Sequence, residues 1–307
     1  MDLDALRAQF DEYQVVLEPD EDTPEWWAGA PSVCRDSVGT YWMACRMREG
    51  DSPRGRRGYE IRILRSDDGA RFEPVHSLRR EDVPIAGFER PALLFDKEAG
   101  RFSLYGCGPY GDGPWCIFRF EDAASPADFV ASSARPVIVP GSTTDPSHNP
   151  VRDYKDPFII RVDGVLHCFL IGADRVERAH HFRSEDGDHW EPVGNGPALD
   201  HGGWHTFYTR PASVLPIGVG YLLIYEGSHP TWHDPIYNIA TGLAWSADLD
   251  SFVDLTPHQP LLTSTTPGEF MTWRYSHWMW DDGALRVYAE VARPNNTNEI
   301  RVWRIEV

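Results

Sequence analysis

Residues 153–193, DYKDPFIIRVDGVLHCFLIGADRVERAHHFRSEDGDHWEPV, contain the pattern that decides the fold. Apolar strands are predicted at 153–160, 165–171 and 178–184, and a turn rich in Asp and Gly then leads to a short fourth strand. Short turns between strands of this kind join antiparallel neighbours. The stretch therefore predicts a four-stranded antiparallel meander.

The same meander recurs five times along the chain. Its first strands are predicted at 27–33, 87–94, 153–160, 207–215 and 274–280, and its second strands at 40–46, 101–107, 165–171, 220–227 and 285–291. The copies begin roughly 50 to 65 residues apart. One meander cannot bury its faces alone, whereas meanders stacked radially form a β-propeller. We therefore expect an all-β fold, a five-bladed β-propeller of four-stranded antiparallel blades; the alternative is a β-sandwich, which five ordered copies disfavour.

Two regions follow from this pattern. Residues 26–307 are expected to form one propeller domain, and residues 1–25 an N-terminal extension. Within the extension, LDALRAQF (3–10) has the spacing of a short helix, and YQVVLE (13–18) is typical of an edge strand that closes the last blade.

The composition of the chain indicates which binding partners and which cellular compartment to expect. The formal charge of -18 disfavours nucleic acid and anionic membranes, because both need clustered cations. The acidic N-terminus lacks the apolar region of a signal peptide, and no apolar run approaches the ~20 residues that span a bilayer. The five cysteines, an odd number in no zinc-like spacing, predict reduced thiols in a cytoplasmic protein. Arginine almost replaces lysine, which fits either a salt-rich cytoplasm or a GC-rich genome.

Propeller geometry brings distant charged residues together. The first strand of each blade lines the axis, and its start lies beside the end of the second strand. We call the end of the axis where these positions meet the funnel. Charged residues expected there are Arg46, Glu89, Arg90, Lys155, Asp156, Arg210, Glu226, His277 and Glu290. Aromatic residues expected to flank them are Trp26, Trp27, Phe88, Tyr154, Tyr208, Trp232 and Trp273, with His205, His229, His233 and Asp234 in loops above.

This set of residues suits a saccharide. Aromatic rings stack on the C–H faces of sugars, and carboxylates and guanidiniums bond to their hydroxyl groups. Cleavage of a glycosidic bond needs two carboxyl groups, one that protonates the leaving oxygen and one that acts on water or on the sugar carbon. The funnel therefore predicts a glycan-cleaving or glycan-binding site for a small saccharide.

Several motifs resemble one group of enzymes. The five meanders, the KDPFII and RPASVL strands, the hairpin YLLIYEGSH followed by TGLAWSADL, and the S-x-D-G-x-x-W/F turns are similar to the five-bladed propeller glycoside hydrolases of families 43, 32, 68, 117 and 130. The likeness covers about residues 25–307. It implies the propeller fold and a glycosidase activity.

The family 43 catalytic pattern transfers only in part. That resemblance implies a base Asp in blade one, a second Asp in a middle blade and an acid Glu in the next. Asp156 matches the middle Asp, whereas Ala30 and Arg210 occupy the other two positions. His277 resembles a histidine that contacts an axial ion or water, so an axial Ca²⁺ or other ion is a candidate, although no cofactor is required.

The remaining acids must then supply the chemistry. We expect Glu226 to act as the acid and Asp156 or Glu89 as the base or nucleophile, with Asp156 kept ionised by nearby cations.

The cations that cluster in the funnel of so acidic a protein indicate that the substrate carries an anionic group, a uronate or a sulfate, or else that phosphate binds there. The phosphate alternative is a phosphorylase similar to family 130. A further alternative is a non-catalytic carbohydrate-binding propeller, which a funnel filled by mutually paired Arg and Glu side chains would favour. The oligomeric state stays open.

Overall fold

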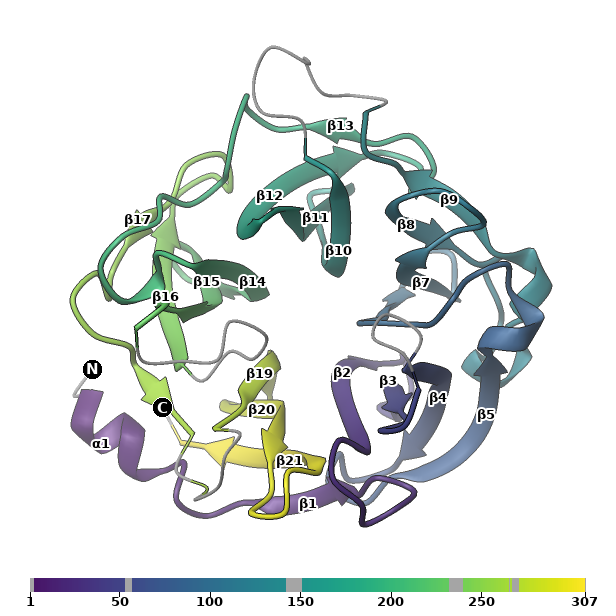
Figure 1. The fold of residues 1–307 in the computed structure, drawn as a ribbon, viewed down its shortest axis with the longest axis horizontal. Helices are drawn as coiled ribbons and strands as arrows, with labels where there is room; N and C mark the ends of the chain where they lie inside the picture. The colour runs from purple at the N-terminus through teal and green to yellow at the C-terminus, as the bar shows by residue number, and fades with distance from the viewer. Residues whose placement is uncertain are drawn as a thin grey trace.

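A computed structural model describes residues 3–52, 57–141, 151–231, 240–264, 266 and 271–306. Its described strands surround a central axis, as Figure 1 shows. No helix in these ranges is long and apolar enough to cross a membrane. The all-β propeller predicted from the sequence is confirmed.

Antiparallel pairing joins the described strands in five successive runs, which we call meanders, and the parallel pairs Trp27–Asn298 and Glu177–Tyr208 join the fifth run to the first and the third to the fourth. The first contains β2 (Trp27–Arg35), β3 (Tyr41–Arg48), β4 (Gly58–Ser66) and β5 (Glu73–Arg79). The second contains β6 (Ala92–Asp96), β7 (Arg101–Pro109), β8 (Trp115–Arg119) and β9 (Arg135–Ile138). The third contains β10 (Asp153–Val162), β11 (Val165–Asp174), β12 (Val176–Ser184) and β13 (Glu191–Pro192).

The last two meanders complete the ring. The fourth contains β14 (Tyr208–Ile217), β15 (Gly220–Ser228), β16 (Ala240–Ser246), β17 (Val253–Asp254) and β18 (Leu262–Thr263). The fifth contains β19 (Trp273–Asp281), β20 (Ala284–Ala292) and β21 (Asn298–Ile305), and β1 (Gln14–Leu17) pairs with β21 as its outer strand. The short helices are α1 (Leu3–Ala8), η1 (Arg80–Asp82), η2 (Pro126–Asp128), η3 (Ala131–Ser133) and η4 (Gly203–His205).

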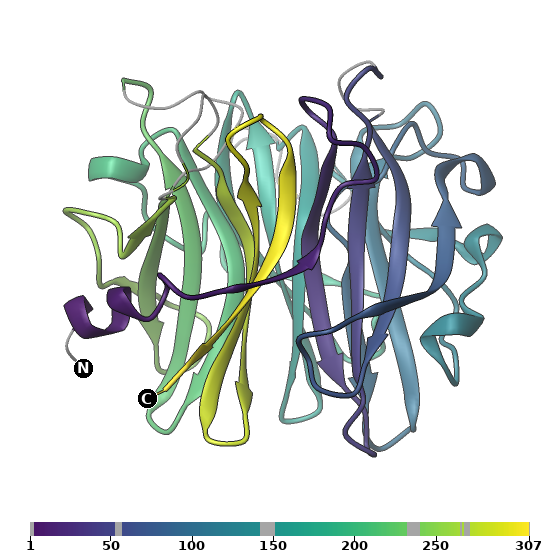
Figure 2. The same ribbon diagram turned by 90° about the horizontal axis from the view of Figure 1, so that it is seen from below.

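Apolar side chains fill the spaces between neighbouring meanders. Ile63 of the first meander packs in one buried cluster with Leu104 and Phe118 of the second. Burial of one such side chain stabilises the fold by about 1.5 to 3 kcal/mol. The strands stand nearly along the axis in Figure 2, so these clusters join the meanders over much of their length.

The S-x-D-G turns are closed by hydrogen bonds within each turn. Ser66 Oγ accepts the backbone N–H of Gly69, and the Asp68 carboxylate accepts those of Ala70 and Arg71. The turns at 184–187 and 246–249 repeat the serine contact. The Tyr288 hydroxyl of the fifth meander donates to Gly69 O at 2.7 Å. The turns therefore also join neighbouring meanders.

The innermost strands carry β-bulges at the funnel. The ladder register shifts between 29 and 32 in β2, between 155 and 158 in β10, and between 274 and 277 in β19. Ala30, Asp156 and Tyr275 lie in these shifts with φ of 53°, 53° and 54°. A positive φ is uncommon for residues other than glycine, and a bulge re-aims the side chain. The bulges therefore decide which side chains reach the axis.

Candidate active site

Asp156 lies at the bulge of β10, where three meanders meet. Its carboxylate accepts the backbone N–H of Arg90 at 3.2 Å and the O–H of Tyr275 at 3.1 Å. Its own N–H donates to Cys107 Sγ at 3.1 Å. Asp156 is only 4% exposed. The sequence therefore located this residue correctly, at the centre of the funnel.

The electrostatic surroundings of Asp156 differ from the prediction. Burial raises the pKa of the Asp156 carboxyl, and the nearby Glu89 carboxylate raises it further. The charges of Arg210 and Lys155 lower this pKa but do not outweigh burial. The charges of Arg210 and Lys155 therefore do not hold this pKa at its usual value, and both side chains contact Glu177.

Tyr275 was missed in the sequence. It occupies the bulge of β19, the position that corresponds to Asp156 in β10, whereas the sequence comparison had chosen Ser276 and His277. Burial raises the pKa of the Tyr275 phenol well above its usual value, so the hydroxyl stays a donor. Alignment of WRYSH (273–277) with YKDPF (154–158) places Tyr275 opposite Asp156.

Glu89 is the carboxylate closest to solvent in this centre, with a side chain 18% exposed. It forms an ion pair with Arg46 Nη1. Burial alone raises the pKa of Glu89, but the guanidiniums of Arg46, Arg48 and Arg274 outweigh burial and hold this pKa below its usual value. Glu89 and Asp156 are therefore two neighbouring carboxyl groups whose pKa values are moved in opposite directions.

Glu290 holds two arginines in place. Its carboxylate pairs with Arg46 at 2.9 Å and with Arg274 at 2.9 Å, and it accepts the backbone N–H of Ala30 at 3.0 Å. A Cβ at Gly29 would lie 1.8 Å from Glu290 Oε2, so only glycine fits there. Glu290 and Arg46 are both fully buried. The structure thus shows them as a framework of the first and fifth meanders and does not expose them to a ligand.

Lys155 and Arg210 meet a carboxylate that the sequence did not single out. Glu177, on β12, pairs with Arg210 and lies 3.6 Å from Lys155 Nζ. The Lys155 ammonium also lies 5.0 Å from the centre of the Trp115 ring. The Lys155 side chain therefore lies toward Glu177 and Trp115. Glu177 was missed because third-strand residues were not expected at the funnel.

Arg90 crosses the axis. It begins next to the second meander and donates to Pro211 O at 3.4 Å and to Ala212 O at 2.5 Å in the fourth. Arg90 is fully buried, and no carboxylate of the described residues lies within ion-pair distance of it. Its prediction as a substrate contact does not fit this geometry, because both terminal nitrogens bind backbone carbonyls.

Glu226 is also enclosed. It is 1% exposed and accepts the backbone N–H of Ser276 at 3.0 Å, and its charge faces Arg90. These contacts join the fourth and fifth meanders.

Most of the predicted aromatic contacts lie elsewhere. Trp27 is fully buried, with the Arg48 guanidinium 3.8 Å from its ring centre. Trp273 is 5% exposed and packs against Phe10 and Trp303 in the core. Both predictions of a stacking surface were therefore wrong, because periodicity does not tell which side of a strand faces the funnel.

Of the other predicted binding residues, some are described by the structure and some are not. Tyr208 is half-buried beneath Arg210, 4.1 Å from ring centre to guanidinium carbon. His229 follows β15 and hydrogen-bonds to the Thr231 hydroxyl. Trp232 lies outside the described residues, as do His233 and Asp234.

His277 is buried beside Arg90 and Phe158. Burial, and then the charge of Arg90, lower the pKa of its imidazole to about 3, and its ring lies 5.6 Å from Phe158. Its Nδ1 is buried without a hydrogen-bond partner in the described structure. No group of three or more His, Cys, Asp or Glu among the described residues could hold a metal ion. The axial Ca²⁺ or other ion stays a prediction.

Comparison with known proteins supports the fold. No family model and no curated protein matches the chain. A glycoside hydrolase structure superposes with a TM-score of 0.74 at 14% identity, over 99% of this chain and 95% of that chain. The resemblance seen in the sequence is confirmed: the chain has the fold of the propeller glycoside hydrolases.

Two further structures show the same similarity. The β-1,2-mannobiose phosphorylase from Listeria innocua, in complex with β-1,2-mannobiose, gives a TM-score of 0.67 at 11% identity, over 100% of this chain and 96% of that chain. The catalytic domain of a GH62 α-L-arabinofuranosidase from Coprinopsis cinerea gives 0.66 at 13% identity, over 95% of this chain and 96% of that chain.

Proposed function

We propose that this chain is an enzyme that cleaves a glycosidic bond in its funnel. The observation that carries the proposal is the pair of carboxyl groups with opposite pKa shifts, Asp156 raised and Glu89 lowered. Such a pair is what acid and base roles at one pH require. The similarity to a glycoside hydrolase and to a phosphorylase adds support.

Asp156 is the acid in this mechanism. Its burial keeps a proton on the carboxyl at a pH where an exposed aspartate has lost it. That proton goes to the leaving glycosidic oxygen as the bond to the sugar carbon breaks. This assignment differs from the sequence prediction, which gave the acid role to Glu226.

Glu89 is the base or nucleophile. Arg46 holds its carboxylate ionised, and its side chain retains some exposure. It can therefore act either on a water molecule or on the sugar carbon, whichever its position relative to the substrate allows.

The substrate in this proposal carries an anionic group. Lys155 is 23% exposed at the funnel, and Arg210 Nη1 is buried without a hydrogen-bond partner among the described residues. A uronate carboxylate or a sulfate would bind both cations. Inorganic phosphate would do so too, in which case the enzyme is a phosphorylase.

A screen of nitrophenyl glycosides and uronate oligosaccharides, run with and without phosphate, tests the proposal. Asp156→Asn and Glu89→Gln should each lower kcat/KM on the substrate found by about 10² to 10⁴-fold. Glu226→Gln serves as the comparison, because an enclosed carboxylate should affect folding before chemistry. Wild-type turnover in both funnel variants would refute the assignment.

A carbohydrate-binding propeller without activity is the second candidate. The observation that favours it is the pairing of Arg46, Arg210, Arg274 and Lys155 with glutamates across the funnel. Saccharide binding by calorimetry without turnover by any glycoside of the screen would select it.

A further inference from the structure

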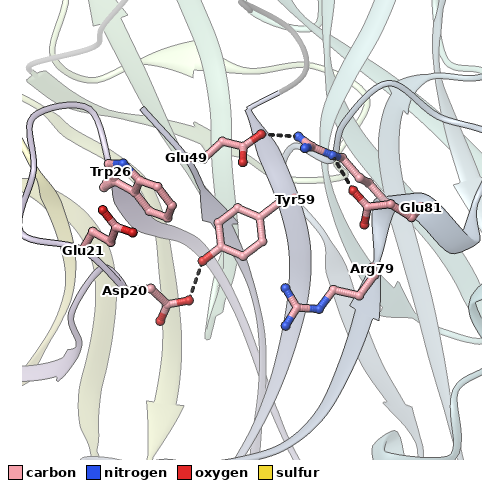
Figure 3. A pocket seen from close by; sticks show the side chains of 8 residues that line it. Asp20, Glu21, Trp26, Glu49, Tyr59, Arg79 and Glu81 are labelled. Carbon is pink, nitrogen blue, oxygen red and sulfur yellow. Dashed lines mark hydrogen bonds and ion pairs between the residues drawn. The ribbon is translucent and has the colours of Figure 1, made fainter. Parts of the chain in front are cut away.

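A cavity of about 410 Å³ lies beside the funnel, in the first meander. Figure 3 shows Trp26, Asp20 and Glu21 on one side of it, Tyr59 in the middle, and Arg79 and Glu81 on the other side. Its volume falls within the ~300 to 1,000 Å³ that small-molecule sites usually occupy. None of the proposed catalytic residues lines it.

The cavity opens on the same face of the molecule as the funnel. Trp26 directly precedes β2, Glu49 directly follows β3, Tyr59 begins β4 and Arg79 ends β5. Because neighbouring strands are antiparallel, these four ends lie on one face. The funnel is built from the same strand ends. A ligand bound on this face can therefore contact both the cavity and the funnel.

Two aromatic rings form the apolar part of the cavity. The Trp26 and Tyr59 rings have centroids 6.0 Å apart and planes inclined by 59°. Two features hold the Trp26 ring in place. The preceding residue, Glu25, has a φ of 70° and forms an ion pair with Arg57. Gly50 packs closely against the ring, because a Cβ at this position would lie 3.0 Å from it. Half-buried rings held in this way suit the C–H face of a sugar.

Ion pairs hold the polar edge of the cavity. Arg80 joins Glu49 at 2.6 Å and Glu81 at 3.0 Å. Asp20 accepts two bonds from Arg62, at 2.9 and 2.7 Å, and one from the Tyr59 hydroxyl at 2.5 Å. Carboxylates accept and guanidiniums donate hydrogen bonds, so both kinds of partner for a hydroxyl group are already in position.

The charges argue against a cationic ligand. An aromatic pair with carboxylates is also how proteins bind organic ammonium groups. Here, however, a guanidinium already lies over Tyr59, with Arg79 Cζ at 5.7 Å from the ring centre. Asp20, Glu49 and Glu81 each have an arginine partner as well. The Arg79 guanidinium thus already occupies the position over the Tyr59 ring that an organic cation would take.

We propose that the cavity between Trp26 and Tyr59 is a second saccharide-binding site, which takes a neutral sugar unit on the funnel face. The proposal rests on the proposed function for the class of ligand, because the funnel indicates that this face meets carbohydrate. It does not require that the funnel be catalytic.

Affinity electrophoresis tests the site in native gels that contain arabinan, xylan, mannan or levan. At least one polysaccharide should retard the wild-type chain, and Trp26→Ala should weaken this retardation at least fivefold. Glu81→Ala changes a side chain that is 64% exposed, so it should fold normally, and it should weaken retardation less. Trp280→Ala is the matched control: Trp280 is 44% exposed near the far end of β19, and its loss should leave retardation unchanged.

The opposite outcomes are equally clear. Retardation that Asp156→Asn abolishes and Trp26→Ala preserves would assign all binding to the funnel and overturn the proposal. An unretarded wild-type chain in all four gels would also overturn it, and a choline-induced rise in melting temperature that Trp26→Ala removes would identify an organic-cation site instead. Turnover without retardation refutes only this second site, whereas retardation without turnover refutes only the proposed catalysis.

Discussion

Two carboxyl groups of the funnel sit in opposite electrostatic surroundings. Asp156 accepts a backbone N–H and a phenol O–H in a buried site, whereas Glu89 has a full guanidinium partner. Burial disfavours a charge that has no ionic partner, and an ion pair favours it. The same two residues therefore carry the proposed chemistry and should also make the stability of the folded protein depend on pH.

The pH dependence of stability should have opposite signs for the two residues. Asp156 has a folded pKa above its ordinary 3.8, so its favourable contribution is present below 3.8 and is lost as pH rises through the folded value. Asp156→Asn should therefore be more stable than wild type at pH 7, by about 1 kcal/mol per unit of raised pKa. Calorimetry from pH 4 to 8 should show that the difference in melting temperature between Asp156→Asn and wild type becomes smaller as the pH is lowered.

Glu89 gives the matched measurement. Its folded pKa lies below its ordinary 4.5, so its contribution is present above 4.5 and is lost as pH falls through the folded value. Glu89→Gln should therefore be less stable than wild type at pH 7, and this loss should fade in acid. The same sign for both variants would contradict the electrostatic description of the funnel.

Tyr275 tunes Asp156 in this description. Its O–H donates to the carboxyl, and such a donor favours the ionised form. Tyr275→Phe should therefore raise the pKa of Asp156, and the alkaline limb of kcat/KM on the substrate of the screen should move to higher pH. Tyr208→Phe, whose ring lies against the Arg210 guanidinium, is the control. A limb that stays in place or moves to lower pH would refute this role.

Sequence could predict part of this site and not the rest. Asp156, Glu89 and Arg46 were found because strand starts and strand ends meet at one end of a propeller axis. Tyr275 was missed because its place depends on a backbone bulge, which no side-chain pattern reveals. Trp27 and Trp273 were misassigned because an aromatic residue beside the axis can face either the funnel or the core, and arginines and other rings cover these two.

At the scale of elements, the N-terminal segment supports the fifth meander. β1 pairs with β21, and Arg7 Nε donates to Leu261 O at 2.8 Å. Phe10 contacts Trp273, Trp278 and Trp303 with ring centroids 5.6 to 5.8 Å apart. The helical and edge-strand spacing at residues 3–18 anticipated these elements, but no pattern in the sequence indicated that Phe10 would enter a cluster of three tryptophans.

Removal of this ring should weaken the meander. Phe10→Ala should lower the free energy of unfolding by about 2 to 4 kcal/mol, because a ring between three tryptophans leaves a cavity. Val15→Ala, on β1 and 46% exposed, should change it by less than about 0.5 kcal/mol. Urea unfolding followed by tryptophan fluorescence measures both. Equal effects would show that the segment is held by strand pairing and not by packing.

At the scale of the whole molecule, direct contacts across the axis join meanders that are not neighbours. Arg90 links the second meander to the fourth, and the contact of Tyr275 with Asp156 links the fifth to the third. Ser32 Oγ and Ser213 Oγ each accept an N–H from a neighbouring innermost strand. The central axis is therefore a bonded core of polar groups.

Arg90→Lys should show how much this core contributes. An ammonium cannot reproduce the two carbonyl contacts of the guanidinium, and it is costly to bury. We expect the free energy of unfolding to fall by about 2 to 4 kcal/mol in chemical denaturation. Arg71→Lys, at a side chain 93% exposed, is the control and should be neutral. A neutral Arg90→Lys would mean that the cross-axis contacts add little to stability.

The pairing of β1 with β21 also sets an order of events in folding. Gln14 lies opposite Val302, so this ladder joins segments from the two ends of the sequence. Closing so long a loop costs entropy before the contact returns any stability. During synthesis β1 must stay unpaired until β21 has left the ribosome. An exposed strand edge invites pairing with another chain in that interval, so the slowest and most aggregation-prone step should be the closure of the ring.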